Sequence, residues 1–339
     1  MSASTLDSLA PTRLAPGAPA PPPRAAIDVS IIIVNWNSLK WLRGCLASLP
    51  ESTAGITAEV IVVDNASIDG SVEAIRREFP AVRVIDNADN RGFAAANNQG
   101  LAMARGRYLL LLNPDTVALG DVIASSVRWM DERADVGVMG CQVMESPDSV
   151  QRTCFRAPSP LHTLLWLTGL AGLFPRSRFF GRGAYAGWDR TEEREVEVIS
   201  GMFLLVRRGA WQQVGPMDES YFVYGEEADW CWRLRRAGWR CVFAPVGRIL
   251  HVDGGNKSTD QASVRMYVQM QKNVLLFQRL NLSRASWLAS RALFLTLSPV
   301  RWIARAILAR LTHDPTARHR AAQCGAALRF HWTGQEPTS

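Results

Sequence analysis

Residues 29–49 read VSIIIVNWNSLKWLRGCLASL, and this stretch predicts a strand followed by a helix. Its first part, Val29–Val34, is an unbroken, mostly β-branched apolar run, which is typical of a strand buried on both faces. The apolar residues of Leu39–Leu49 then recur at helical spacing. The same unit repeats: strands are predicted at Glu59–Val63, Val82–Ile85 and Tyr108–Leu112, and helices at Asp69–Phe79 and Phe93–Ala104. This alternation predicts an α/β fold, a mostly parallel central sheet with helices on both faces.

Ligands of such sheets bind beyond the carboxyl ends of the strands. Asn35, Asp64 and Asn113–Asp115 directly follow three of the predicted strands. We therefore expect a binding site where these residues meet.

After about residue 133 the alternation loosens. Strands are expected at Val136–Cys141, Val196–Val206 and Gly247–Leu250, and helices at Glu226–Ala237 and Ser263–Leu280. A long irregular stretch with an apolar patch, Leu161–Phe174, separates the first two of these strands.

The composition fits a globular protein with a sizeable core, since 47% of the 339 residues are hydrophobic and 20% are charged. The six cysteines include no C-x-x-C pair, which favours reduced thiols in a reducing compartment over a disulfide framework or a zinc site. No run of 18 uninterrupted apolar residues occurs, so a membrane-spanning helix is not expected. These observations predict a cytoplasmic protein.

Three regions are expected along the chain. Residues 1–26 lack the pattern of a secretory signal and are rich in proline, which predicts a disordered tail. Residues 27–282 carry the α/β pattern. Residues 283–339 account for most of the net positive charge, because eight arginines stand against the single acid Asp314 between Ser283 and His331. A charge surplus this local argues against general nucleic-acid binding.

In that last region, Ser298-Pro299 predicts the start of a helix. Ile303, Ile307 and Leu311 would share one face of it, with Arg301 and Arg305 on the other, and Arg310 would interrupt the apolar side. Such a basic, amphipathic, tryptophan-bearing helix suits the surface of an anionic membrane. A helix packed on the core with a solvated basic face is the alternative.

Four groups of residues could carry chemistry. Asp64-Asn65-Ala66-Ser67 could bind a nucleobase and ribose, and Asn113-Pro114-Asp115 could hold a divalent metal against a diphosphate, although both also read as turns. Glu226, Glu227 and Asp229 open a helix; they could complement the helix dipole or supply a general base. His251, after a predicted strand, is a possible metal ligand or an ordinary buried histidine.

The chain resembles the family 2 glycosyltransferases of the GT-A fold (the nucleotide-diphospho-sugar transferase fold), and most closely their bacterial rhamnosyltransferase-like branch. The resemblance covers about residues 27 to 280, and the ordered set of its segments makes it specific. The matching segments are Val29–Asn37, Val62–Ser71, Asn90–Asn98, Leu112–Asp115, Ser200–Arg208, Met217–Phe222, Tyr224–Arg233 and His251.

The resemblance implies a role for each segment. A pyrimidine nucleotide-sugar donor would be held by Val34, Asn35, Asp64, Asn65, Arg91, Gly92, Asn97, Asn113 and Asp115. Gly92 would permit close backbone approach to the donor. Asp115 and His251 would bind Mg²⁺ or Mn²⁺. Gly201 and Trp230 would lie in the acceptor site.

For catalysis, the resemblance implies that Glu227 removes the proton of the acceptor hydroxyl in an inverting transfer, with Glu226 and Asp229 as alternative bases. Two positions depart from the common pattern of the family. Asn113 stands where an acid is usual, so metal binding should depend on the donor diphosphate. Glu227 stands where Asp is more common, which leaves the identity of the base open.

Rhamnose from dTDP-rhamnose is the first expectation for the donor, with UDP-sugars as the alternative. The acceptor is expected to be a cell-envelope glycan or a polyprenyl-linked sugar, with the enzyme peripheral on the inner face of the membrane. A catalytically inactive nucleotide-sugar-binding scaffold is the competing interpretation. A sugar nucleotidyltransferase is disfavoured, because Asn35-Trp36-Asn37-Ser38 is not a glycine-rich, basic loop.

Overall fold

The computed structural model describes residues 27–146, 148–252 and 264–337 of the chain. The expected tail, 1–26, lies outside the described residues, as does Ser263, where a helix was expected to begin. That helix, α10, is described over Val264–Asn281.

A mixed sheet forms the centre of the molecule, in the strand order β3-β2-β1-β4-β11-β6-β12-β5. The four strands predicted in the first half run parallel: β1 (Val29–Asn35), β2 (Ala58–Asp64), β3 (Arg83–Asp86) and β4 (Tyr108–Leu112). In the second half, β11 (Phe203–Arg207) is antiparallel to β4 and to β6 (Val136–Ser146). The last pairs join β12 (Arg240–His251) to β6 in parallel and to β5 (Thr116–Leu119) in the antiparallel sense.

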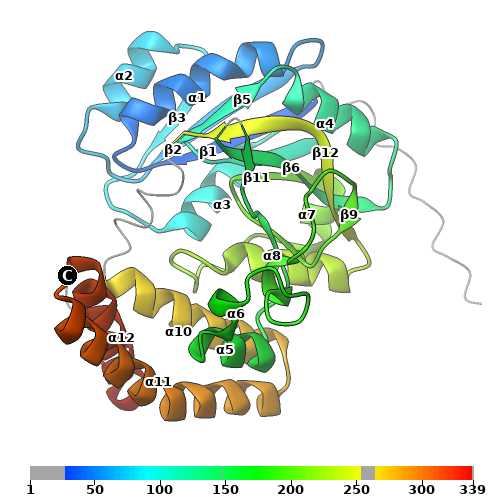
Figure 1. The fold of residues 1–339 in the computed structure, drawn as a ribbon. Coiled ribbons are helices and arrows are strands. Elements are labelled where there is room, and N and C mark those ends of the chain that lie inside the picture. Colours follow the sequence, from blue (N-terminus) through cyan, green and yellow to red (C-terminus); the bar gives the residue numbers. More distant parts are fainter. Residues whose placement is uncertain (1–26, 147, 253–263, 338–339) are drawn as a thin grey trace, which may run out of the picture.

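Helices cover both faces of this sheet (Figure 1). On one face α1 (Leu39–Ser52), α2 (Ser71–Glu78) and α4 (Val122–Asp131) contribute to one hydrophobic cluster. On the other face α3 (Phe93–Met103), α7 (Arg208–Val214) and α8 (Glu226–Arg236) share a second cluster with the opposite sides of the strands. The α/β class and its mostly parallel sheet are confirmed.

Two expectations for the second half need correction. The strand expected over Val196–Val206 is split into β10 (Val198–Ile199) and β11, because the backbone at Ser200–Met202 leaves the sheet; β10 pairs with β8 (Cys154–Phe155) instead. The turn 113–115 leads directly into β5 and then into α4, and neither element was predicted. The remaining short elements are β7 (Ser149–Val150), β9 (Arg194–Glu195), α5 (Pro160–Leu167), α6 (Leu170–Leu173) and a 3₁₀ turn at Arg182–Ala184.

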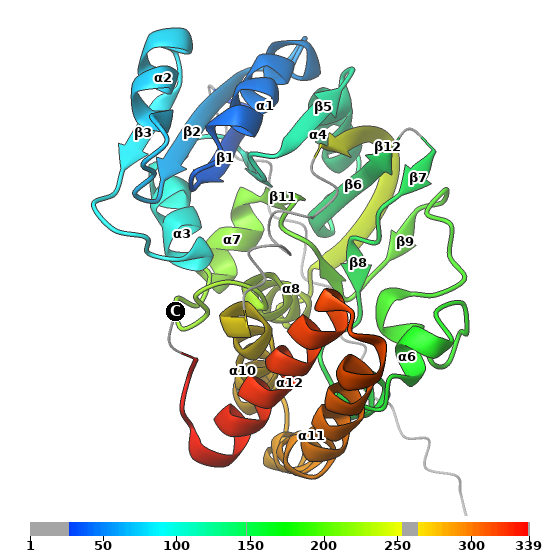
Figure 2. The same cartoon turned by 60° about the vertical axis from the view of Figure 1, so that its left-hand side comes forward.

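At the C-terminal end, α11 (Arg284–Thr312) and α12 (Pro315–Thr333) lie side by side below the sheet (Figure 2). The helix expected to start at Ser298-Pro299 instead begins at Arg284, where the Ser283 hydroxyl accepts a hydrogen bond from the Ser286 amide, and Pro299 lies inside it. Phe294 of α11 shares a hydrophobic cluster with Leu167 of α5 and Leu275 of α10.

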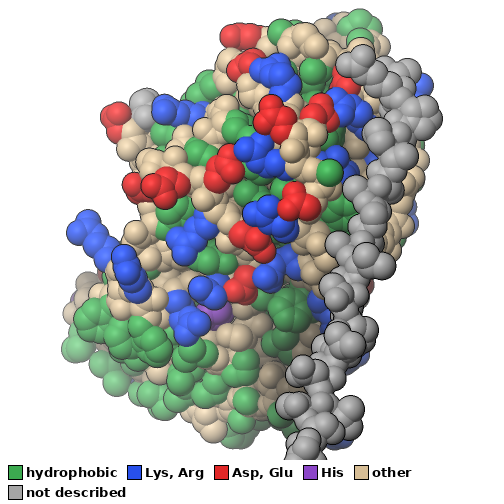
Figure 3. Space-filling view, turned by 90° about the vertical axis from the view of Figure 1, so that its right-hand side faces the viewer, with side chains coloured by type: hydrophobic (Ala, Val, Ile, Leu, Met, Phe, Trp, Pro, Cys, Tyr) green, Lys and Arg blue, Asp and Glu red, His purple; other side chains and the backbone are tan. Residues whose placement is uncertain are grey.

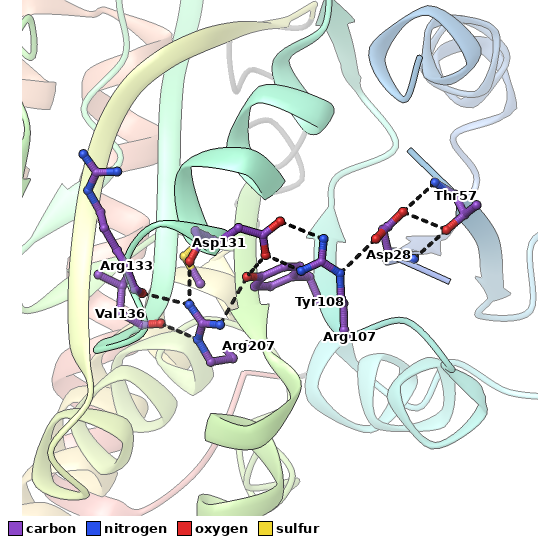
Figure 4. A network of polar contacts seen from close by, with 9 residues as sticks. Asp28, Thr57, Arg107, Tyr108, Asp131, Arg133, Val136 and Arg207 are labelled. Carbon is purple, nitrogen blue, oxygen red and sulfur yellow. Dashed lines mark hydrogen bonds and ion pairs between the residues drawn. The ribbon is translucent and has the colours of Figure 1, made fainter. Parts of the chain in front are cut away.

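A polar network fixes the sheet edge that lies opposite the carboxyl ends of the parallel strands (Figure 4). Asp28 accepts from Arg107, which pairs with Asp131 of α4. The Tyr108 hydroxyl donates to Asp131 at 2.8 Å and accepts from Arg207 at 3.1 Å. These paired charges bind β1, β4, β11 and α4 together, so this edge is structural.

Candidate active site

Asn35 and Asp64 lie side by side at the carboxyl ends of β1 and β2. The Asn35 amide donates to Asp64 Oδ2 at 2.7 Å, and Asp64 Oδ1 accepts from the Ser67 amide at 2.8 Å. Ser67 Oγ in turn accepts from the Asn37 amide at 2.8 Å. The side chains of Asn35 and Asp64 are fully buried, and their hydrogen bonds hold the loop at residues 36–38 in place. Asn35 Oδ1 is buried with no hydrogen-bond partner among the described residues.

The segment at residues 90–97 borders this pair. Asn65 donates to the Gly92 carbonyl at 3.1 Å, and Asn90 Oδ1 accepts from the Gly92 amide at 3.0 Å. Arg91 is exposed, whereas Asn97 is buried and its amide caps the Phe93 carbonyl at 2.9 Å. Asn97 therefore supports the start of α3.

Glycine is required at position 92 because Phe222 packs closely against the backbone there. Its φ of +82° lies in the left-handed region, and a Cβ there would stand 2.4 Å from the Phe222 carbonyl oxygen. The Phe93 amide also donates to that oxygen, at 2.7 Å. In this structure the loop that carries Phe222 packs closely against the Gly92 backbone, where a close approach of the donor was expected.

Asp115 and His251 meet because β5 pairs with the end of β12, which sets His251 opposite Thr116. His251 Nε2 lies 3.1 Å from Asp115 Oδ2, and His251 Nδ1 lies 2.9 Å from the Gln151 amide oxygen. Gln151 thus orients the ring through Nδ1, and Nε2 faces the Asp115 carboxylate. A cation bound at this place would be held by both side chains.

This pair suits a divalent cation. Asp115 Oδ1 is buried with no hydrogen-bond partner among the described residues, so one carboxylate oxygen remains to be satisfied. Within those residues no group of three or more His, Cys, Asp or Glu side chains comes together in a form that could hold a metal. The described residues therefore supply Asp115 and His251 as ligands, and oxygen atoms of a bound molecule are suited to the remaining positions.

Glu227 lies at the start of α8, and its side chain faces residues 200–202, which connect β10 to β11. Its Oε1 accepts from the Gly201 amide at 3.1 Å. A Cβ at Gly201 would stand 2.9 Å from that oxygen and 3.2 Å from the Phe93 ring, so only glycine fits between them. The Glu227 carboxyl also interacts with the backbone of Gly225 and with the side chain of Glu226, so its position at the start of α8 is held from several sides.

Glu226 and Glu227 are adjacent carboxyl groups that repel each other when both are charged. Burial raises the pKa of Glu227. Burial and repulsion from Glu227 raise the pKa of Glu226 well above its ordinary value. Glu226 is 1% exposed, so burial disfavours its charged form.

The other two residues of this helix have structural partners. Both Asp229 oxygens are engaged, one by Arg233 Nε at 2.7 Å and one by Asn281 of α10 at 2.7 Å. In place of the expected acceptor contact, Trp230 packs in the core with no exposed surface, and its indole donates to the Gly215 carbonyl at 3.0 Å. Neither side chain faces the space beside Glu227.

Replacing Asp229 by Ala should lower stability, because the buried carboxylate joins α8 to α10. We expect a loss of about 1.5–3 kcal/mol in the free energy of unfolding, measured by urea denaturation. Asp135→Ala, which breaks an exposed pair with Arg240, is the matched control and should cost under about 1 kcal/mol. Equal losses in the two variants would contradict the structural role of Asp229.

These groups lie on the side of the sheet where the parallel strands β1, β2 and β4 end. The Asn113 amide donates to the Met202 carbonyl, next to Gly201, and Phe93 connects Gly201 to Gly92. Gln151 and Phe222 were not predicted as site residues. Phe222 was in a matching segment but had no assigned role, and Gln151, in a short loop after β7, had no sequence signal.

The family model described as "Glycosyl transferase family 2" matches residues 30–211. The N-acetylglucosaminyl-diphospho-decaprenol L-rhamnosyltransferase of Mycobacterium tuberculosis is 30% identical over 300 residues, which cover 84% of this chain and 91% of the relative. The low-salt glycan biosynthesis hexosyltransferase Agl10 of Haloferax volcanii is 21% identical, over 84% of this chain and 90% of the relative.

Among solved structures, the mannosyltransferase PcManGT from Pyrobaculum calidifontis, in complex with GDP-Man and Mn²⁺, aligns with a TM-score of 0.57 at 17% identity. The alignment covers 96% of this chain and 92% of that protein. A likeness at this identity shows that the two share a fold.

Proposed function

The chain belongs to glycosyl transferase family 2 and is a glycosyltransferase, and on that premise we propose that it transfers rhamnose from dTDP-rhamnose to a hydroxyl of a lipid-linked sugar in cell-envelope glycan synthesis. The similarity to the mycobacterial rhamnosyltransferase over nearly the whole of both chains supports the sugar and the acceptor class. The observation that carries the chemistry is the gathering of Asp64, the Asp115–His251 pair and Glu227 at one sheet edge.

We assign the nucleotide to the carboxyl ends of β1 and β2. Asp64 and Asn35 hold Ser67 and, through it, the backbone of Asn37, so they shape the loop that the base and ribose would meet. The exposed Arg91 supplies a positive charge for the donor diphosphate. Asp64 suits uracil and thymine alike, so UDP-sugars are the alternative donors.

Asp115 and His251 would hold Mg²⁺ or Mn²⁺, which when bound neutralises charge on the departing nucleoside diphosphate. The buried, unpaired Asp115 oxygen and the facing His251 nitrogen support this assignment. Asn113 contributes no charge, so the donor diphosphate must complete the ligand set.

Glu227 is the general base of the proposed transfer. Its carboxylate takes the proton of the acceptor hydroxyl while that oxygen bonds to the anomeric carbon and the bond to the diphosphate breaks, which inverts the anomeric centre. The Gly201 amide holds one carboxylate oxygen and so orients the other. The hydrogen bonds of both Asp229 oxygens to Arg233 and Asn281 favour Glu227 over Asp229 as the base.

The raised pKa of Glu227 sets the pH dependence. A base must be deprotonated, so activity should fall as the pH drops through the raised pKa, and this acid limb should lie above the ordinary range of glutamic acid. A pH profile of kcat/KM measures it. Full activity down to the ordinary glutamic acid range would contradict this role of Glu227.

A panel of donors with and without Mn²⁺ or Mg²⁺ tests the choice of nucleotide by thermal shift. A ligand at about a hundred times its Kd adds roughly 2.7 kcal/mol to stability, which is easily detected. We expect a metal-dependent shift with dTDP-rhamnose. A shift with UDP-sugars only would replace the donor, and a shift with GDP-sugars only would contradict a pyrimidine site.

A further inference from the structure

The outward face of α11 is largely apolar, and exposed Arg310 interrupts it near its C-terminal end. Exposed residues recur every three or four positions and carry no charge: Ala285, Ala289, Ala292, Thr296, Val300, Ile303, Ile307 and Leu311. Ile303 and Ile307 are each about half exposed, and Leu311 is 76% exposed. At 1.5 Å per residue this stripe is roughly 40 Å long. We call these eight residues the α11 stripe.

The opposite face of α11 is fixed to the protein, so the stripe cannot turn inward. Phe294 is buried in the cluster with Leu167 and Leu275, and its ring stacks on His331 of α12. Arg301 donates to the Leu167 carbonyl at 2.9 Å and lies over the Trp166 ring.

By length and composition, α11 is apolar enough to cross a membrane, and among the described residues it is the one helix that meets this condition. The sequence did not predict such a helix, because its apolar residues do not form an uninterrupted run. Only 17% of its most apolar window is buried in the protein. However, the contacts of Phe294 and Arg301 hold it along the surface of α5 and α12. A spanning position would break these contacts, whereas lying flat on a membrane would keep them.

Positive charge borders the stripe. Arg310, Arg318 and Arg320 are exposed near the junction of α11 and α12, and Arg284 is exposed at the other end of α11. Figure 3 shows hydrophobic side chains gathered at the end of the molecule where α11 lies in Figure 1, with Lys and Arg side chains next to them. Two copies meeting through this face would bring like charges together, whereas an anionic lipid surface complements them.

We propose that the α11 stripe inserts into the headgroup region of an anionic lipid bilayer, with the helix axis parallel to the membrane plane. The apolar side chains would leave water, and the bordering arginines would meet lipid phosphates. This goes beyond the proposed sugar transfer and does not depend on it. It would place the enzyme where a lipid-linked acceptor resides.

Flotation of the full chain with phosphatidylcholine vesicles, with and without phosphatidylglycerol, tests the proposal. We expect binding that requires phosphatidylglycerol and weakens as salt is raised. The triple variant Ile303→Ser, Ile307→Ser, Leu311→Ser should lose roughly tenfold or more in partitioning. Met103→Ser with Leu119→Ser, two exposed apolar residues elsewhere, should bind like the unaltered chain.

A second pair of variants guards against misfolding of the triple variant. Arg310→Gln with Arg318→Gln changes only exposed charges and should reduce binding to phosphatidylglycerol vesicles several-fold, whereas Arg236→Gln on α8 should not. Donor-induced thermal shifts should be unchanged in all of these variants, which separates a failure here from a failure of the proposed function.

Three results would overturn the proposal. The unaltered chain could fail to float with anionic vesicles, or the triple variant could float as well as the unaltered chain. Alternatively, light scattering could show a lipid-free dimer that the triple variant converts to a monomer, with vesicle binding unaffected. The last result would assign the α11 stripe to a second copy of the chain.

Discussion

Replacing Glu227 by Gln should lower the rate of sugar transfer about 10²–10⁴-fold, because the amide cannot accept the hydroxyl proton. The substitution preserves the size of the side chain, and the amide oxygen can still accept from the Gly201 amide. Donor binding should therefore be retained, since we propose that the donor's nucleotide binds at the carboxyl ends of β1 and β2. The loss should appear in kcat and in kcat/KM to a similar extent.

Initial rates with a saturating donor, together with calorimetric titration of that donor, measure the two effects. Glu132→Gln is the matched control, because this carboxylate is exposed at the end of α4 and should be dispensable. Turnover close to that of the unaltered enzyme in Glu227→Gln would remove Glu227 from the role of base. Loss of donor binding would show that Glu227 contacts the donor instead.

Replacing Asp115 by Asn should abolish the metal dependence of donor binding. The variant keeps the shape of the side chain but leaves an uncharged amide facing His251, so the proposed cation loses the Asp115 carboxylate. We expect transfer at a fixed metal concentration to fall at least about a hundredfold, given that metal stabilisation of the leaving group is worth several kcal/mol. Rates should recover in part at higher Mn²⁺.

Asp121→Asn serves as the control, because this residue precedes α4 on the surface and its carboxylate binds Ser125 and Arg128 of that helix, away from His251. Titrating the donor with and without EDTA gives the readout. If Asp115→Asn kept a metal-dependent donor affinity, the metal would have to bind elsewhere.

The first half of the sheet could be predicted from sequence because β1, β2 and β4 are continuous apolar runs with helical patterns between them. β5 could not, because its four residues form a strand only through pairing with the distant β12. Pro299 suggested a helix start because proline is favoured there. Proline inside a helix costs about 3 kcal/mol, and the burial of Phe294 and Ser298, which precede Pro299 in α11, helps to offset this cost.

The proposed site could be predicted in part. Asp64 and Asn113–Asp115 stand out because they end strands, but their turn chemistry left the evidence ambiguous without the resemblance. Asp115 and His251 are 136 residues apart, so the contact between them depends on the β5–β12 register. Trp230 and Asp229 are buried in the structure, and this distinguishes them from Glu227 as site residues. The sequence shows all three close together at the start of one helix, so it could not make this distinction.

The most direct test is a transfer assay with the purified full chain, dTDP-rhamnose, Mn²⁺ and a polyprenyl-diphosphate-linked N-acetylglucosamine, read by mass spectrometry of the lipid product. We predict addition of one deoxyhexose, no addition in EDTA, and an anomeric configuration opposite to that of the donor. An unmodified acceptor together with an intact donor would contradict rhamnosyl transfer by this enzyme, and a retained anomeric configuration would contradict the role of Glu227.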